Sequence, residues 1–159
     1  MPVLMSVDGI QGPGVIPSYE GWLLLSSFSW SGSRGTGKRM DRHGVMGVFV
    51  VAPQLKAVSV ARSADIVTPL IWQLMLTNTK KTVKFAWLRT GSDGLTPFLE
   101  ITLTKALITA MGESATLGEP SETITFAYDE VEARVVNVGN RLTGPQDVVS
   151  YVLSQGSRI

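Results

Sequence analysis

Cysteine is absent from this 159-residue sequence, and histidine occurs once, as His43. Without cysteine the chain has no disulfides and no thiolate chemistry, so it can pass between reducing and oxidising compartments unchanged. One histidine with no cysteine cannot complete a zinc site. No apolar run is long enough to span a membrane, and residues 1–14 lack the basic region and long apolar core of a Sec signal. We therefore expect neither membrane insertion nor Sec-dependent export.

Charge is also scarce in this sequence. Charged residues make up 17% of the chain, and the formal net charge is +1. A net charge this small provides no electrostatic basis for binding nucleic acid. Apolar residues account for 44%, and a chain of this length can bury a sizeable core. We therefore predict one globular domain over residues 1–159.

Most of the chain alternates apolar and polar residues, a pattern typical of half-buried strands. The sequence GSDG at 91–94 predicts a hairpin. In the last run the apolar parity changes at Asp129 and Glu130, which we interpret as a β-bulge. In the second run, Trp22, Leu24, Phe28 and Trp30 are expected to share one face. The expected strands are 1–10, 19–30, 48–62, 81–90, 96–111 and 122–136.

One segment has helical spacing instead. Thr68 is a candidate N-cap, Pro69 suits the first helical position, and Asn78 can close the C-terminus. Many strands with a single helix predict a mainly β fold: a β-barrel, or two packed antiparallel sheets, with one short flanking helix. The residues expected to face that core are Ile71, Leu74 and Met75.

The run SWSGSRGTGKRMDRHG, residues 29–44, has the glycine and lysine spacing of a P-loop at Gly32, Gly37 and Lys38. A P-loop needs Ser or Thr after its lysine to hold Mg²⁺, and it opens a helix. Arg39 stands at the metal-ligand position, and no helical period follows. We therefore interpret residues 31–46 as a long, basic, Gly-rich extended loop between two strands, and we expect no nucleotide hydrolysis.

No other pattern assembles a catalytic site. Glu130 and Glu132 fall on the non-core face of their strand, which favours a solvated or interface surface over an acid/base pair. No serine stands in a Gly-x-Ser-x-Gly elbow. Tryptophans in apolar runs most often pack in a core. We predict no enzymatic activity, no cofactor and no metal.

Several stretches, taken in order, resemble the hemolysin-coregulated protein (Hcp) family, the tube subunits of type VI secretion systems. The helix entry RSADIVTPLIW carries the resemblance at Asp65, Thr68, Pro69 and Ile71. The resemblance spans residues 3–136, and the tail 137–159 matches only as a last short strand around Val148 to Leu153. The other similar stretches are YEGWLLLSSFSWS, the Gly-rich insertion GSRGTGKRMDRHG, LEITLTKALITAM and ETITFAYDEVEARV.

The resemblance implies a β-barrel that assembles into hexameric rings. In this family the rings stack into a tube that a spike caps and a contractile sheath and baseplate surround, and the lumen can carry effector proteins. It also implies a protein that is cytoplasmic before assembly and is then secreted without a Sec signal. Two readings stay open beside it: a phage-like tail-tube protein, and a monomeric small-ligand-binding β-barrel.

We expect the Gly-rich loop to contact a neighbouring subunit or ring, because its cations can reach an acidic face. Such a flexible loop becomes ordered only on contact, which keeps stacking weak and reversible. The possible partner face is Glu130 and Glu132. The residues predicted to make the contact are Arg34, Gly35, Gly37, Lys38, Arg39, Asp41, Arg42 and His43.

Overall fold

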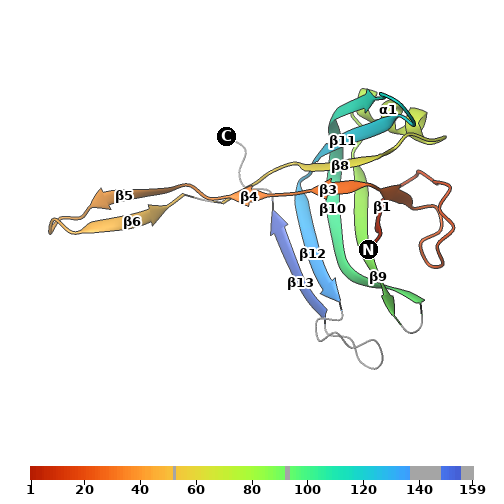
Figure 1. The fold of residues 1–159 in the computed structure, drawn as a ribbon. Coiled ribbons are helices and arrows are strands. Elements are labelled where there is room, and N and C mark those ends of the chain that lie inside the picture. Colours follow the sequence, from red (N-terminus) through yellow and green to blue (C-terminus); the bar gives the residue numbers. More distant parts are fainter. Residues whose placement is uncertain (52, 92–93, 137–147, 155–159) are drawn as a thin grey trace.

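The structure is a computed structural model that describes residues 1–51, 53–91, 94–136 and, as backbone, 148–154. Within these residues the chain is mainly β, with one short helix beside two sheets and an arm that projects from them (Figure 1). All strand pairs in the sheets are antiparallel. The predicted fold class is therefore confirmed.

The first sheet has the strand order β2-β1-β9-β10-β12-β13. The predicted hairpin at GSDG joins β9 to β10, with Gly91 opposite Gly94. The last strand, predicted around Val148 to Leu153, pairs with β12. The strands of this sheet are β1 (Val3–Val7), β2 (Leu23–Leu25), β9 (Lys81–Gly91), β10 (Gly94–Ser114), β12 (Glu130–Val136) and β13 (Val148–Ser154).

The second sheet shares β10 with the first and continues through β11 (Ser121–Ala127), β8 (Val58–Ser63) and β3 (Ser27–Ser29). β10 changes sheet near Lys105, where the backbone takes a positive φ of 52° and the register with β9 shifts between Leu103 and Ala106. The path of paired strands ends at β2 and β3. The described strands thus form two packed sheets and not a closed barrel.

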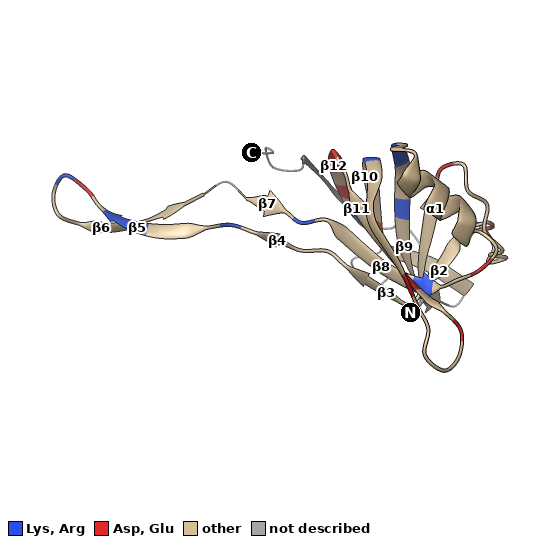
Figure 2. Ribbon diagram, turned by 90° about the horizontal axis from the view of Figure 1, so that it is seen from above, with Lys and Arg blue, Asp and Glu red and all other residues tan. Residues whose placement is uncertain are grey.

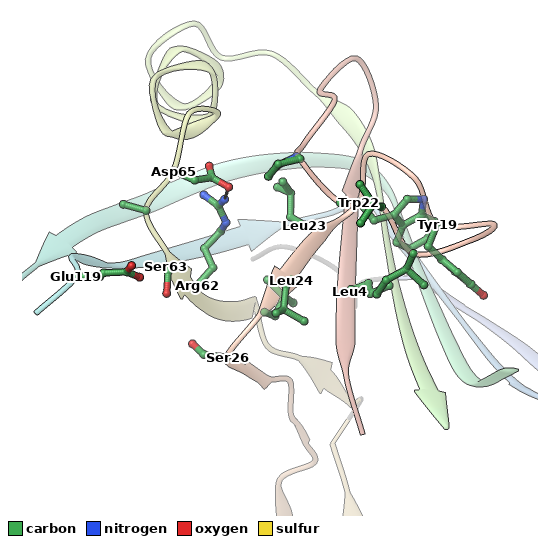
Figure 3. A pocket seen from close by; sticks show the side chains of 16 residues that line it. Leu4, Tyr19, Trp22, Leu23, Leu24, Ser26, Arg62, Ser63, Asp65 and Glu119 are labelled. Carbon is green, nitrogen blue, oxygen red and sulfur yellow. Dashed lines mark ion pairs between the residues drawn. The ribbon is translucent and has the colours of Figure 1, made fainter. Parts of the chain in front are cut away.

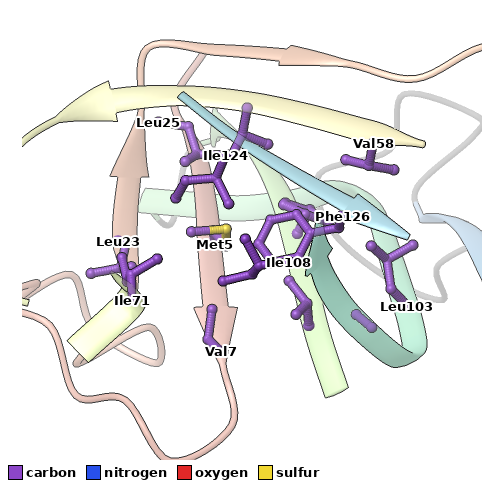
Figure 4. Packing of buried hydrophobic residues seen from close by; sticks show 14 of the residues in the cluster. Met5, Val7, Leu23, Leu25, Val58, Ile71, Leu103, Ile108, Ile124 and Phe126 are labelled. Atoms are coloured by element: carbon purple, nitrogen blue, oxygen red, sulfur yellow. The ribbon is translucent and has the colours of Figure 1, made fainter. Parts of the chain in front are cut away.

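Apolar side chains from both sheets fill the space between them (Figure 4). Phe85 lies at the centre, edge-on to Phe28 at 4.9 Å and to Phe126 at 6.3 Å between ring centroids. The face predicted for the second strand is wrong at Leu24, which is 63% exposed while its neighbours Leu23 and Leu25 are buried.

The reason lies at Ser26, between β2 and β3. Its backbone N–H donates to the carbonyl of Ala61 on β8. The predicted strand is therefore two short strands in different sheets, and the parity of inward residues changes between them. Phe28 and Trp30 still pack against the core, as predicted, and Trp22 packs with a smaller cluster on the far side of β1.

The predicted bulge at Asp129 and Glu130 is also wrong. The chain forms two strands there, β11 in the second sheet and β12 in the first, with a corner at Tyr128 and Asp129. Phe126 faces the core before the corner and Val131 faces it afterwards. The parity changes because the chain passes from one sheet to the other.

Helix α1 (Thr68–Leu76) packs against β10. It begins one position earlier than predicted, because Val67 is the N-cap and Thr68 is already helical. Pro69 stands in the first turn, as expected. Asn78 takes a positive φ of 49° just past the helix, as a C-terminal residue often does. The predicted apolar face is confirmed, with Ile71 buried and Leu74 and Met75 packed against the core.

A buried ion pair ties the helix to the second sheet. Arg62 on β8 and Glu122 on β11 are 2% and 0% exposed, and their side chains lie 2.9 Å apart. Asp65 also pairs with Arg62. The hydroxyl of Thr68 donates to the second oxygen of Glu122 at 2.7 Å. Burial raises the pKa of Glu122, and the hydrogen bonds from Thr68 and Arg62 oppose that rise.

We predict that Glu122→Ala lowers the free energy of unfolding by about 3–5 kcal/mol, because it leaves the Arg62 guanidinium buried without its main partner. The measurement is the urea midpoint followed by circular dichroism. Glu119→Ala, at an exposed loop position nearby, is the matched control and should leave the midpoint nearly unchanged. Equal midpoints for the two variants would contradict a stabilising role of the pair.

Candidate functional site

The most unusual feature of the molecule is the arm, residues 31–56, which leaves the sheets between β3 and β8 (Figures 1 and 2). Its base pairs β4 (Gly32–Ser33) with β7 (Gln54–Leu55), and its outer part pairs β5 (Thr36–Met40) with β6 (Met46–Val50). At about 3.3 Å per residue, twelve extended residues carry its tip about 40 Å from the sheets.

The arm corrects the prediction of a flexible loop over 31–46. The segment is part of a β-hairpin, and all of its glycines except Gly44 lie within or beside strands. The ring of Phe49 lies over Gly37, its partner across the hairpin, where a Cβ would overlap it. Arg39 stacks on the same ring, with its guanidinium carbon 5.7 Å from the centroid. An aromatic ring covering a strand glycine stabilises such a pair.

A tight turn closes the arm at its tip. One oxygen of the Asp41 side chain accepts the backbone N–H groups of His43 at 2.8 Å and Val45 at 2.9 Å. Gly44 takes a positive φ of 78°, which the turn requires. Lys38 lies in the middle of β5, and strand β6 follows it where a P-loop would open a helix. The rejection of a P-loop is therefore confirmed.

One face of the arm carries a row of exposed apolar side chains. Opposite residues of an antiparallel pair share a face, and the pairs on this face are Met40 with Met46, Lys38 with Val48, and Thr36 with Val50. We call Met40, Met46, Val48 and Val50 the apolar face. Their side chains are 63%, 56%, 70% and 57% exposed. The opposite face holds the Arg39–Phe49 stack.

A chain of hydrogen bonds anchors the base of the arm. The indole N–H of Trp30 donates to the hydroxyl of Tyr128 at 2.8 Å, and that hydroxyl donates to the carbonyl of Lys56 at 2.7 Å. The backbone N–H of Lys56 in turn donates to the carbonyl of Ser31. Burial raises the pKa of the Tyr128 phenol, opposed by the hydrogen bond from Trp30. Tyr128 therefore stays protonated at neutral pH and can donate.

The structure gathers all the predicted contact residues on the arm. Arg34 and Gly35 join β4 to β5, and the carbonyl of Gly35 accepts the N–H of Val51 at 2.8 Å. Lys38 and Arg39 lie on β5. Asp41, Arg42 and His43 form the tip.

The predicted partner face lies elsewhere, on β12. Glu130 is exposed and Glu132 is half-buried. Glu132 lines a shallow cavity of about 370 Å³ together with Glu100 and Arg134, whose side chains form an ion pair 3.7 Å apart. The structure does not bring these two glutamates to the arm of the same chain.

A second apolar surface, which sequence reasoning missed, crosses β1 and β2. It is a groove of about 580 Å³ in which the exposed Leu24 lies (Figure 3). Sequence reasoning missed this groove because strand alternation placed the side chain of Leu24 in the core. Six of the residues that line the groove, called here the β1–β2 groove, are Leu4, Pro13, Val15, Ile16, Trp22 and Leu24.

The rest of the described chain offers little chemistry. No group of three or more histidine, aspartate or glutamate side chains among the described residues could hold a metal ion. The one helix that the structure describes is too short to cross a membrane. Trp30 and Trp87 pack against the core between the sheets and do not line a ligand cavity there.

Comparison with known proteins points to one family. A family model described as "Type VI secretion system effector, Hcp" matches residues 4–135. No curated protein matches the chain. Among solved structures, a type VI secretion system effector from Yersinia pestis is 15% identical, with a TM-score of 0.72 and coverage of 96% of this chain and 98% of the other.

Two further structures have the same fold. Hcp1 from Escherichia coli EAEC 042 is 13% identical, with a TM-score of 0.73 and coverage of 98% and 99% of the two chains. The secreted protein Hcp3 from Pseudomonas aeruginosa is 15% identical, with a TM-score of 0.67 and the same coverage. At these identities the structures show a shared fold over nearly the whole chain.

We predict that Tyr128→Phe loosens the base of the arm. The change leaves the Trp30 indole N–H and the Lys56 carbonyl without their partner, at a cost of about 1–3 kcal/mol. Trypsin should then cut faster in the arm, after Lys38, Arg39 or Arg42, and the urea midpoint should fall. Tyr19→Phe, at a half-buried tyrosine outside this chain of hydrogen bonds, is the control. Equal cleavage rates for the two variants would show that the anchor does not hold the arm.

Proposed function

The chain belongs to the Hcp family of type VI secretion systems, a family of tube subunits and not of enzymes, and on this premise we propose that six copies close into a ring. The single observation that carries the proposed self-assembly is the arm. A well-packed monomer rarely projects a row of apolar side chains into water, and such a surface marks a protein contact.

The sheets support a ring as well. A ring uses a heterologous contact, in which each copy presents two different faces that fit each other. The first sheet ends at β2 on one side and at β13 on the other. Unpaired strand edges attract other strands, and burying them against neighbouring copies removes that hazard.

We propose that the arm makes the contact with a neighbouring subunit or ring. Four of its cations, Arg34, Lys38, Arg39 and Arg42, outnumber its single carboxylate, Asp41. Glu130 and Glu132 of a neighbour are the proposed acidic partners. Each such exposed ion pair is weak, but the pairs repeat around a ring. Gly35, Gly37 and His43 take part as the backbone and tip of the arm.

We further propose that the rings stack into the inner tube. The spike, the sheath and baseplate, and effector proteins in the lumen would be its other partners. The protein would be cytoplasmic before assembly and secreted with the tube. Residues 1–159 would act as one tube domain. The filled core between the sheets gives no support to a monomeric ligand-binding barrel.

We predict that replacing residues 36–50 with an Asn-Gly turn spares the fold of the monomer and abolishes long tubes. In this segment every residue except Gly37 is exposed, so the core loses nothing. The urea midpoint should be unchanged, while light scattering and negative-stain images should show rings that no longer stack. Long tubes formed by the shortened protein would show that the arm is only a connector. A full-length protein that stays monomeric at micromolar concentrations would contradict the ring itself.

A further inference from the structure

We infer that the apolar face of the arm docks into the β1–β2 groove of a second copy of this chain. The inference rests on the proposed self-assembly and names the two surfaces that meet. Both are apolar and exposed, and none of the residues that the structure describes covers either of them. Three observations support the arm of a second copy as the partner of the groove: the residues that form the groove, its charges, and the direction of the arm.

The groove is already formed in the single chain. Tyr19 and Trp22 pack edge to face at 5.0 Å between ring centroids. Together with Ile16 they lie over Leu4, Ala86 and Leu88 on the outer side of the first sheet. This packing holds residues 11–22 as one wall of the groove, and Figure 3 shows Leu4 and Leu24 lying between that wall and Arg62.

The exposed side chains of the groove match the apolar face in kind. Leu24 is 63% exposed and Val15 is 85% exposed. Both are aliphatic, as is Val48 at the middle of the apolar face. The arm offers unbranched Met40 and Met46 beside it, and methionine adapts its shape to an irregular surface. Contact between the two surfaces removes both from water.

The charges also fit. Arg62 lines one end of the groove, but it is buried and held by Asp65 and Glu122. Glu119 lies at the same end, as Figure 3 shows, and it is exposed. Lys38 shares the apolar face with Val48. An arm laid along the groove therefore brings a cation of one copy to a carboxylate of the other.

The direction of the arm requires a second copy. The arm points away from the sheets in both views (Figures 1 and 2), so it cannot reach the groove of its own chain. Each copy has one arm and one groove, and the two are different surfaces. Such a heterologous contact repeats from copy to copy and leaves no arm uncovered within an assembly.

The absence of cysteine permits a direct test. Leu24→Cys is placed in one protein and Val48→Cys in another, with a tag on one of them to separate the products by mass. The two are mixed and oxidised mildly, and the disulfide-linked dimers are separated without reductant. We expect at least tenfold more Leu24–Val48 heterodimer than in a mixture of the Leu24→Cys protein with a Gly47→Cys control. Gly47 lies one residue away on the opposite face of the arm and has room for a side chain.

Equal cross-linking from the two faces of the arm would overturn the inference, and so would a product dominated by Leu24–Leu24 or Val48–Val48 homodimers. Rings seen by negative stain without the Leu24–Val48 product would overturn the docking inference alone and leave the proposed ring intact. A chain that forms no oligomer at all would overturn both.

A second measurement does not depend on disulfide geometry. Leu24→Asp puts a charge in the groove, and Leu117→Asp puts one at a fully exposed leucine outside it. We expect Leu24→Asp to raise the protein concentration needed for assembly at least tenfold, with circular dichroism unchanged. Leu117→Asp should leave that concentration within twofold of the parent. Equal values for the two variants would overturn the inference.

Discussion

The hydrogen-bond chain from Trp30 through Tyr128 to Lys56 is the constraint on which the use of the arm depends. A two-stranded hairpin has no core of its own and is marginally stable by itself. The direction of the arm is therefore set where it leaves the sheets. Tyr128 stands at the corner between β11 and β12, so the packing of the two sheets places its hydroxyl and, through it, both strands of the arm.

The sheets can provide a firm base because single elements connect them. β10 pairs with strands of both sheets, so neither can shift without the other. Between the second sheet and helix α1, Glu122 joins Arg62 of β8 to Thr68 of the helix. A buried pair of this kind contributes little net free energy when it is intact, but losing one partner is costly. Its effect is to fix one arrangement of helix and sheet.

Periodicity predicted much of this fold from the sequence. The hairpin at GSDG and the helix face at Ile71 follow from local patterns, whereas the last strand was expected from the family resemblance. The side chain of Leu24 could not be assigned to the correct face from the sequence, because its exposure depends on the break between β2 and β3 at Ser26. That break depends on a hydrogen bond from Ser26 to Ala61, which is distant in sequence. Glu122 was missed for the same reason, since its partner Arg62 lies 60 residues away. The charges of the arm led to its prediction as a contact segment, but its apolar face was hidden by glycines that favour a loop.

A preformed arm changes how assembly is controlled. A flexible loop would have to become ordered on contact, and that cost would keep stacking weak. The Phe49 ring over Gly37 and the Asp41 turn hold the arm in one conformation, so the inferred docking would require little further ordering. The hazard is aggregation, because an apolar hairpin can pair with any exposed strand. The cations along the arm oppose arm-to-arm contact by like-charge repulsion. The β1–β2 groove is apolar and carries the exposed carboxylate of Glu119 at one end, so in the inferred contact apolar burial would supply affinity and charge would disfavour the wrong pairing.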